Sequence, residues 1–170
     1  YLDLATYFIE ERGKTDSNKK NYFINENEIL KKNSQKLDYS KLPSNLRDIV
    51  DFYLAKDESV FKDLEYWQAH KETIKQNTAE GHSVRALYMF TAMADLARIN
   101  NNKDLLKTCK LLWRNIVDKR MYIHSGVGSA HIGERFSFDY DLPNDMAFAE
   151  TCASIALIYF ANRLSKIEFN

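Results

Sequence analysis

Three consecutive stretches between residues 77 and 161 carry apolar residues at helical spacing, and they differ in how much of their circumference is apolar. The first, from Asn77 to about Ile99, and the third, from Ala153 to Ala161, are apolar on nearly every side. The second, from Leu105 to Val117, has one apolar stripe and basic residues outside it. A helix that is apolar all round is buried, whereas a striped helix lies at a surface. The order inner, outer, inner predicts alternating helical layers, as in an α/α barrel built from helical hairpins.

Sheet structure is not expected in this chain. It has five glycines and two prolines, and no stretch alternates polar and apolar residues between turn signals. The predicted fold class is therefore all-α, as part of an (α/α)6 barrel. Such a toroid takes about a dozen helices, and 170 residues provide roughly half of them, so we expect an incomplete toroid. Its exposed barrel edges make self-association a further expectation.

The rest of the chain is predicted in four parts. Residues 1–12 form a helix that belongs to a preceding repeat, and residues 14–42, rich in Lys, Asn, Ser and Asp, form an irregular excursion. Pro43 begins a helix that runs to Leu54, and a short helix covers Ser59 to Trp67. Because the chain starts at Tyr1 within an apolar-periodic segment, we expect residues 1–170 to be a fragment of one longer domain.

Charge, apolar run length and cysteine content limit the binding partners and the location that we expect for this chain. Lys plus Arg and Asp plus Glu both number 24, so no general attraction to nucleic acid or to anionic lipid is expected. The longest apolar runs fall short of the roughly 18 to 20 residues of a membrane helix, so no membrane partner is expected. Two cysteines, Cys109 and Cys152, are too few for a disulfide framework. This favours a reducing compartment, with a cytoplasmic location as the expectation, or no redox constraint at all.

Residues 121–152 are predicted to form an active-site loop at the barrel mouth. Three of the five glycines fall there, among acidic and aromatic residues, a combination that suits sugar hydrolysis. Glu134 is a candidate general acid, because the nearby Phe136 and Phe138 would favour a protonated carboxyl. The alternative is a solvated loop carboxylate.

Glu150 and Cys152 are candidate zinc ligands, since zinc accepts both carboxylate oxygen and thiolate sulfur. Positions two apart on a regular helix diverge by about 200°, so joint ligation requires an irregular backbone between them. The alternative is a buried structural thiol beside an unrelated acid. His82, at the start of the first buried helix, would face the barrel mouth; otherwise it is a capping or core histidine.

Six stretches, in this order, resemble the β-L-arabinofuranosidases of glycoside hydrolase family 127. They are Tyr1-Leu2-Asp3-Leu4-Ala5, Gln68-Ala69-His70-Lys71, Gly81-His82-Ser83-Val84-Arg85-Ala86, the loop from Gly126 to Glu134, Phe138-Asp139-Tyr140-Asp141-Leu142-Pro143-Asn144 and Ala149-Glu150-Thr151-Cys152-Ala153. The resemblance implies that residues 1–170 are the central fragment of a catalytic α/α barrel. The activity it implies is the retaining release of terminal β-L-arabinofuranose, with a carbohydrate as the partner.

By position, the resemblance makes Glu134 the general acid/base, Glu150 and Cys152 two of the zinc ligands, and His82 a substrate contact. It also implies a zinc-bound cysteine nucleophile beyond Asn170, so this chain alone is expected to be inactive and to bind zinc weakly or not at all. The sequence departs from the family's Val-Arg-Glu-Gln run at residues 73–76. Two other functions remain open. One is a different α/α-barrel carbohydrate enzyme that acts with acids alone, such as an unsaturated glucuronyl hydrolase, and the other is a non-catalytic helical interaction module.

Overall fold

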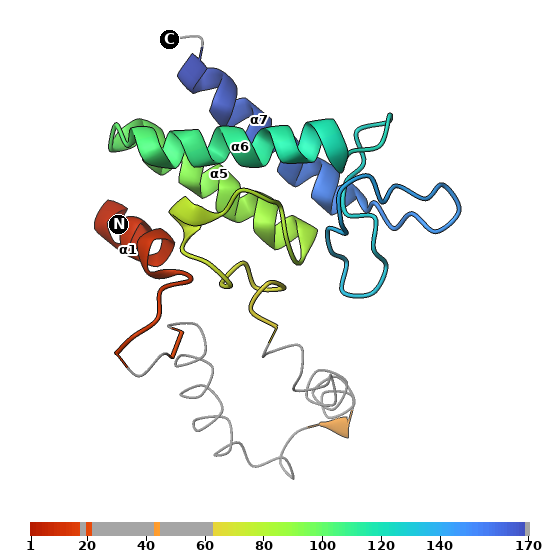
Figure 1. Cartoon of the computed structure of the whole chain (residues 1–170), viewed down its shortest axis with the longest axis horizontal. Helices are drawn as coiled ribbons and strands as arrows, with labels where there is room; N and C mark the ends of the chain where they lie inside the picture. Colours follow the sequence, from red (N-terminus) through yellow and green to blue (C-terminus); the bar gives the residue numbers. More distant parts are fainter. Residues whose placement is uncertain (18–19, 22–42, 45–62, 169–170) are drawn as a thin grey trace.

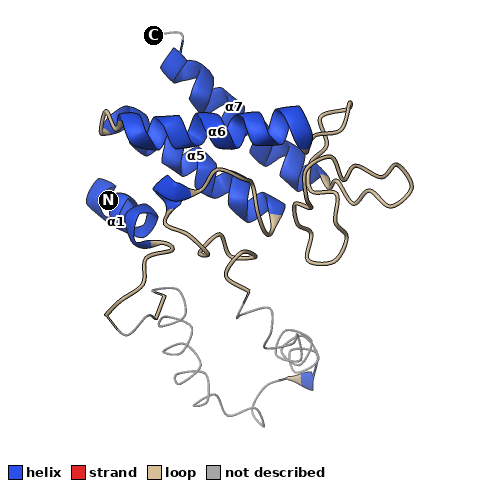
Figure 2. Ribbon diagram, viewed as in Figure 1, coloured by secondary structure: helices blue, strands red, loops and turns tan. Residues whose placement is uncertain are grey.

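The protein is described here from a computed structural model that covers residues 1–17, 20–21, 43–44 and 63–168 (Figure 1). Over those ranges the secondary structure is helical, with backbone pairing limited to isolated bridges (Figure 2). The elements are α1 (Leu2–Glu11), a short 3-10 helix η2 (Thr73–Lys75), α5 (Ser83–Ile99), α6 (Lys103–Lys119) and α7 (Thr151–Glu168). The all-α prediction is confirmed. None of the helices described has the length and apolarity needed to cross a membrane.

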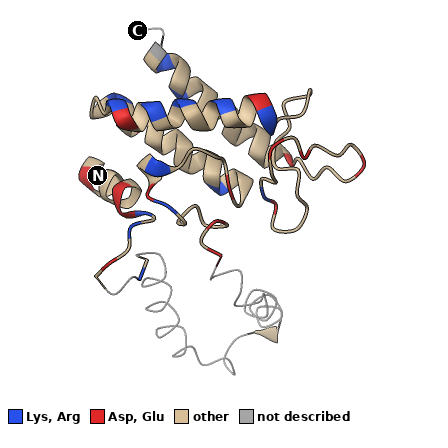
Figure 3. Cartoon of the chain, in the orientation of Figure 1, with Lys and Arg blue, Asp and Glu red and all other residues tan. Residues whose placement is uncertain are grey.

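Helix α5 packs against both α6 and α7 and forms the centre of the core. Phe90 of α5 and Phe160 of α7 are fully buried, with ring centroids 5.7 Å apart. Helix α6 buries one stripe, including Leu112 and Ile116, and carries its basic residues outside (Figure 3). This is the striped outer helix that the sequence predicts. The predicted break at residues 100–102 is also confirmed, and the Asn102 side chain caps α6 by accepting from the Leu105 amide at 3.0 Å.

The prediction that α5 and the helix after the loop are buried on all sides is wrong for the described residues. Tyr88 of α5 is 50% exposed, and Ile158 of α7 is 64% exposed. A helix with apolar residues all round needs neighbours all round. Among the described elements α5 packs against α7, α6 and α1, which still leave Tyr88 exposed, and α7 packs mainly against α5. Tyr88 and Ile158 are thus exposed apolar side chains on these two helices. Self-association through exposed barrel edges stays a prediction.

Helix α5 begins later than predicted. Asn77 does not cap it; the cap is His82, and residues 76–82 run in turns and extended backbone. This segment is held by other partners, since the Ala79 amide donates to the Asn115 side chain at 2.9 Å. The described part of the predicted 59–67 helix also differs, because residues 64–68 form turns closed by the Ala69 amide bonding to the Leu64 carbonyl.

Helix α1 matches its prediction within a residue at each end. The predicted helix from Pro43 to Leu54 lies outside the described residues after residue 44. Most of the predicted excursion, residues 14–42, lies outside them too. Near its beginning, Thr15 and Asn21 form an isolated bridge.

A polar cluster around Asp139 ties the loop after α6 to the helices. The Asp139 carboxylate accepts from Asn115 at 2.9 Å and from Lys119 and Arg120 at 2.8 Å each. Arg120, 7% exposed, also donates to the Ala79 carbonyl, so one guanidinium joins the loop to the segment before α5. The hydrogen bond from Lys119, with those from Arg120 and Asn115, lowers the pKa of Asp139 to about 2. In the folded protein the Asp139 carboxylate is therefore charged at neutral pH.

Replacing Asp139 with asparagine should lower the free energy of unfolding at pH 7 by roughly 1–2 kcal/mol, because the charged partners lose their counter-ion. The folded-state pKa of Asp139 lies below its ordinary value of 3.8. The stabilisation is therefore complete above that value and disappears as the pH falls through about 2, so the difference between wild type and variant should shrink in acid. Urea unfolding at several pH values measures it. Asp145→Asn, an exposed residue of the same loop, is the control, and equal effects of the two variants would contradict the expectation.

Candidate active site

Glu134 lies in a tight turn formed by residues 130–135. Ala130 and Arg135 exchange two backbone hydrogen bonds of 3.2 Å, and the Glu134 amide donates to the His131 carbonyl, also at 3.2 Å. Gly133 and Glu134 both have left-handed backbone, with φ of 76° and 50°. A non-glycine residue seldom adopts this conformation, and such strain gathers at functional sites. The turn sets the direction in which the Glu134 side chain leaves the backbone.

The turn is bonded to the first residues of α5. Ser83, fully buried, donates from both its amide and its hydroxyl to the Glu134 carbonyl, each at 2.9 Å. The Phe136 amide donates to the Gly81 carbonyl, also at 2.9 Å. Glu134 is therefore fixed at its backbone to the helix that forms the centre of the core.

His82 meets Glu134 at this point. Its Nε2 lies 3.2 Å from Oε2 of Glu134, and its Nδ1 accepts from the Arg85 amide at 3.4 Å. The ring of Tyr66 packs edge-on against the imidazole, with centroids 5.7 Å apart. Burial, reinforced by the positive charge of Arg85, lowers the pKa of His82, so the imidazole is neutral at pH 7. The capping alternative is thus correct, and the same ring also contacts the candidate acid.

The surroundings of the Glu134 carboxyl differ from the aromatic pocket expected from the sequence. Phe136 is buried in the core and Phe138 is 72% exposed. The carboxyl is 47% exposed and has an imidazole beside it. Aromatic spacing along the chain indicated an apolar environment, but the turn sends those rings in other directions.

Glu150 and Cys152 lie on either side of the start of α7. The helix begins at Thr151, so Glu150 directly precedes it, whereas Thr151 and Cys152 belong to its first turn. The Glu150 carbonyl accepts from the amide of Ala153 at 3.1 Å. Cys152 is a free, exposed thiol, which excludes a buried structural role for it within the described residues. By contrast, burial raises the pKa of Cys109 to about 12, so that thiol stays protonated.

The approach to Glu150 is fixed beside the Glu134 turn. The Ala149 amide donates to the Gly128 carbonyl at 3.0 Å. Gly128 itself lies against Ser83, where a β-carbon would come within 2.6 Å of the serine hydroxyl, at a φ of 79°. The carboxylates of Glu134 and, to a smaller degree, Glu150 oppose the lowering of the His82 pKa by burial, without reversing it. The structure therefore brings His82 and Glu134 into contact and places Glu150 within electrostatic reach of His82.

The donors near this site can be compared with those that zinc requires. A carboxylate and an accessible thiol are both suitable ligands, and protein zinc sites take three or four such groups. Among the described residues no three His, Cys, Asp or Glu side chains gather closely enough to hold an ion. Glu150 and Cys152 are suitable zinc ligands by type. Together they make up about half of a complete ligand set.

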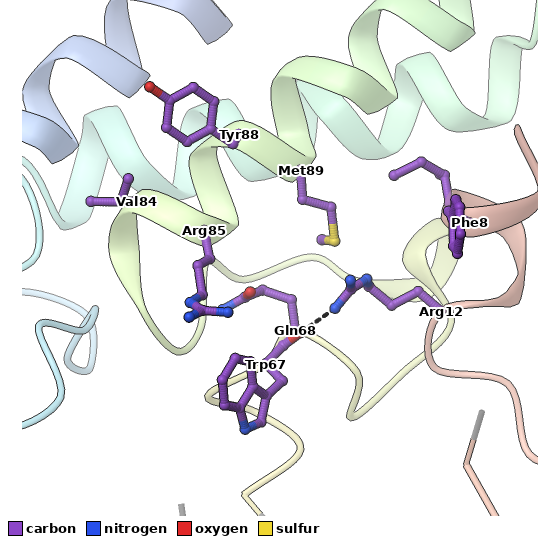
Figure 4. Close-up of a pocket in the computed structure, with 9 residues that line it drawn as sticks. Phe8, Arg12, Trp67, Gln68, Val84, Arg85, Tyr88 and Met89 are labelled. Carbon is purple, nitrogen blue, oxygen red and sulfur yellow. Dashed lines mark hydrogen bonds between the residues drawn. The ribbon is translucent and has the colours of Figure 1, made fainter. Parts of the chain in front are cut away.

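The prominent hollow of the surface is separate from these residues. It has a volume of about 370 Å³ and lies between α1 and the first turns of α5. Figure 4 shows Arg85, from α5, and Arg12, from the end of α1, reaching toward the Trp67–Gln68 segment. Arg85 stacks over the Trp67 ring at 4.2 Å, and Arg12 donates to the Trp67 carbonyl at 2.6 Å. None of the four candidate site residues lines this hollow.

Sequence analysis missed Ser83 and Tyr66, which hold the Glu134 backbone and the His82 ring. A weak signal existed for Ser83, since it is a polar residue directly after His82 at the start of an otherwise apolar helix. Tyr66 gave no such signal, because it lies far from Glu134 in sequence and among other aromatic residues.

The described helices pack in layers, and the loop that carries Glu134 is fixed at the start of α5; comparison with known proteins assigns this arrangement to a glycoside hydrolase family. Residues 1–168 match the family of the β-L-arabinofuranosidase GH127 catalytic domain, and the chain belongs to that family. It is 42% identical over 116 residues to the non-reducing end β-L-arabinofuranosidase of Bifidobacterium longum subsp. longum, a match that covers 65% of the chain and 18% of that enzyme.

Two solved structures are similar. A GH127 β-L-arabinofuranosidase from Geobacillus stearothermophilus T6 is 38% identical, with a TM-score of 0.72, over 100% of this chain and 23% of that one. A GH127 β-arabinofuranosidase is 37% identical, with a TM-score of 0.61, over 71% of this chain and 22% of that one. The chain thus spans about a fifth of the length of these relatives. The sequence-based resemblance to the family is confirmed.

Proposed function

We propose that this chain supplies the acid/base carboxyl of a β-L-arabinofuranosidase whose active site is completed by residues outside the chain. The observation that carries the proposal is the Glu134 carboxyl, fixed through its backbone to the start of α5 and set 3.2 Å from a neutral imidazole. Relatives that are named β-L-arabinofuranosidases match most of this chain. We call the longer protein the parent protein.

The proton steps fall to Glu134. Protonated, the carboxyl gives its proton to the oxygen of the departing group, and the resulting carboxylate then takes a proton from the water that attacks next. Its 47% exposure leaves it accessible to a substrate. The neutral imidazole of His82 lies beside the Glu134 carboxyl, and we propose that it also contacts the bound substrate there. The nucleophile, a cysteine in this proposal, belongs to the part of the parent protein outside this chain.

Glu150 and Cys152 would provide two of the ligands of a zinc ion. Zinc, when bound, lowers the pKa of coordinated thiols and orients the sulfur. Support comes from the donor types and from the exposure of Cys152. The acid-only alternative, as in an unsaturated glucuronyl hydrolase, needs neither ligand, and the interaction-module alternative needs no site at all.

Glu134→Gln in the parent protein should lower kcat/KM for a methyl β-L-arabinofuranoside on the order of 10²-fold or more, because the amide cannot deliver a proton. Steady-state hydrolysis measures the loss. Glu65→Gln, at an exposed position, is the matched control and should leave the rate within about threefold of wild type. Full activity of the Glu134 variant would favour the interaction module.

Cys152→Ser should lower both zinc content and hydrolysis in the parent protein, since a serine hydroxyl is a poor zinc ligand. Metal analysis by mass spectrometry and turnover of a nitrophenyl β-L-arabinofuranoside measure the two effects. Cys109→Ala removes the other thiol at a buried position and should keep the metal. Undiminished activity of Cys152→Ser would favour the acid-only enzyme.

The 170-residue chain by itself should bind well below one equivalent of zinc and show no measurable hydrolysis of the nitrophenyl substrate. Two ligands hold zinc weakly, and the nucleophile is proposed to lie elsewhere. Metal analysis after gel filtration, together with a turnover assay, checks both expectations. Robust hydrolysis by the isolated chain would contradict the proposed division of the site.

A further inference from the structure

We propose that His82 is a positioning residue for the Glu134 carboxyl, separate from any contact it makes with the sugar. This inference rests on the proposed acid/base role of Glu134. It concerns which oxygen of the carboxyl is held and which is left to act on the substrate. Two contacts fix the imidazole, and a third joins it to Glu134.

The imidazole is held on several sides. Its Nδ1 accepts from the Arg85 amide at 3.4 Å, as the cap of α5. The edge-on ring of Tyr66 limits rotation about the side-chain bonds, and the His82 side chain is only 15% exposed. A ring that caps a helix and packs against an aromatic residue has little freedom to follow a substrate.

This anchoring also decides where the imidazole proton is. A neutral imidazole carries one proton, and because Nδ1 is the acceptor for the Arg85 amide, the proton is on Nε2. Nε2 lies 3.2 Å from Oε2 of Glu134, so the N–H faces that oxygen. Contacts of this kind commonly shorten when a substrate binds.

The consequence for Glu134 follows from its exposure. A carboxyl that is 47% exposed, on a backbone fixed by Ser83, could still rotate about its side-chain bonds. A donor at Oε2 removes much of that freedom and leaves Oε1 to carry the transferred proton. Small misplacements of a catalytic group cost large factors in rate, so the held orientation matters for proton transfer.

Two variants separate the two ends of the imidazole. In His82→Asn the side-chain oxygen occupies the position of Nδ1, so the helix cap is kept and the donor to Glu134 is lost. In His82→Gln the amide nitrogen is as many bonds from the backbone as Nε2, so the donor can be restored. Each variant is made in the parent protein, and its melting temperature is compared with that of wild type to confirm folding.

Two substrates separate positioning from sugar binding. A nitrophenyl group leaves readily without a proton, whereas a methoxy group needs one, so loss of acid positioning should affect only the methyl β-L-arabinofuranoside. We expect His82→Asn to lower kcat/KM on the order of 10-fold or more for the methyl substrate and less than about threefold for the nitrophenyl substrate. His82→Gln should return the methyl activity to within about threefold of wild type.

Equal losses on both substrates would overturn the inference, because they indicate a contact with the shared sugar. An unchanged rate in His82→Asn, or a His82→Gln variant no better than His82→Asn, would overturn it as well. These outcomes are distinct from failure of the proposed function, which is shown by full activity of Glu134→Gln on the methyl substrate.

Discussion

The site depends on the attachment of one loop backbone to the start of one helix. Ser83 donates twice to the carbonyl of Glu134, and the amide of Phe136 bonds to the carbonyl of Gly81. Helix α5 is in turn held by α6 and α7 through buried aromatic and aliphatic side chains. A strained turn persists only where its surroundings over-determine it, and here the buried serine and the core helix do so. Without this attachment Glu134 would be a loop residue with no fixed direction.

A second attachment, through charge, keeps the remainder of the loop in place. Asp139 gathers three donors from α6 and the residue after it, and Arg120 extends the contact to the segment before α5. The Gly128 and Ala149 backbones then meet beside Ser83 and lead into Glu150. The long loop from residue 121 to 150 therefore returns to the start of α5, where Glu134 is held. The candidate acid/base, Glu134, and the candidate zinc ligand, Glu150, are both positioned from this helix end.

Sequence reasoning was strongest where the signal is local. The apolar stripe of α6, the polar break at residues 100–102 and the position of Glu150 ahead of α7 could all be read from spacing along the chain. It failed where a distant partner overrides local preference. Asn77 and Glu80 have the pattern of a capping box, but the segment around Ala79 is hydrogen-bonded to Asn115 and Arg120. The helix cap therefore lies five residues later, at His82. The apolar environment predicted for the Glu134 carboxyl from its aromatic neighbours was wrong for a related reason. A turn directs adjacent side chains to different sides.

By itself the sequence determined the helical class, the likeness to GH127 and the types of donor available, a carboxyl, an imidazole and an acid–thiol pair. These follow from periodicity and residue chemistry, which are properties of the chain at each position. Only the tertiary structure decided that His82 caps α5 with one nitrogen and meets Glu134 with the other. That pairing joins residues about fifty positions apart, and it exists because backbone hydrogen bonds close a loop onto a helix end, a contact that no local pattern encodes.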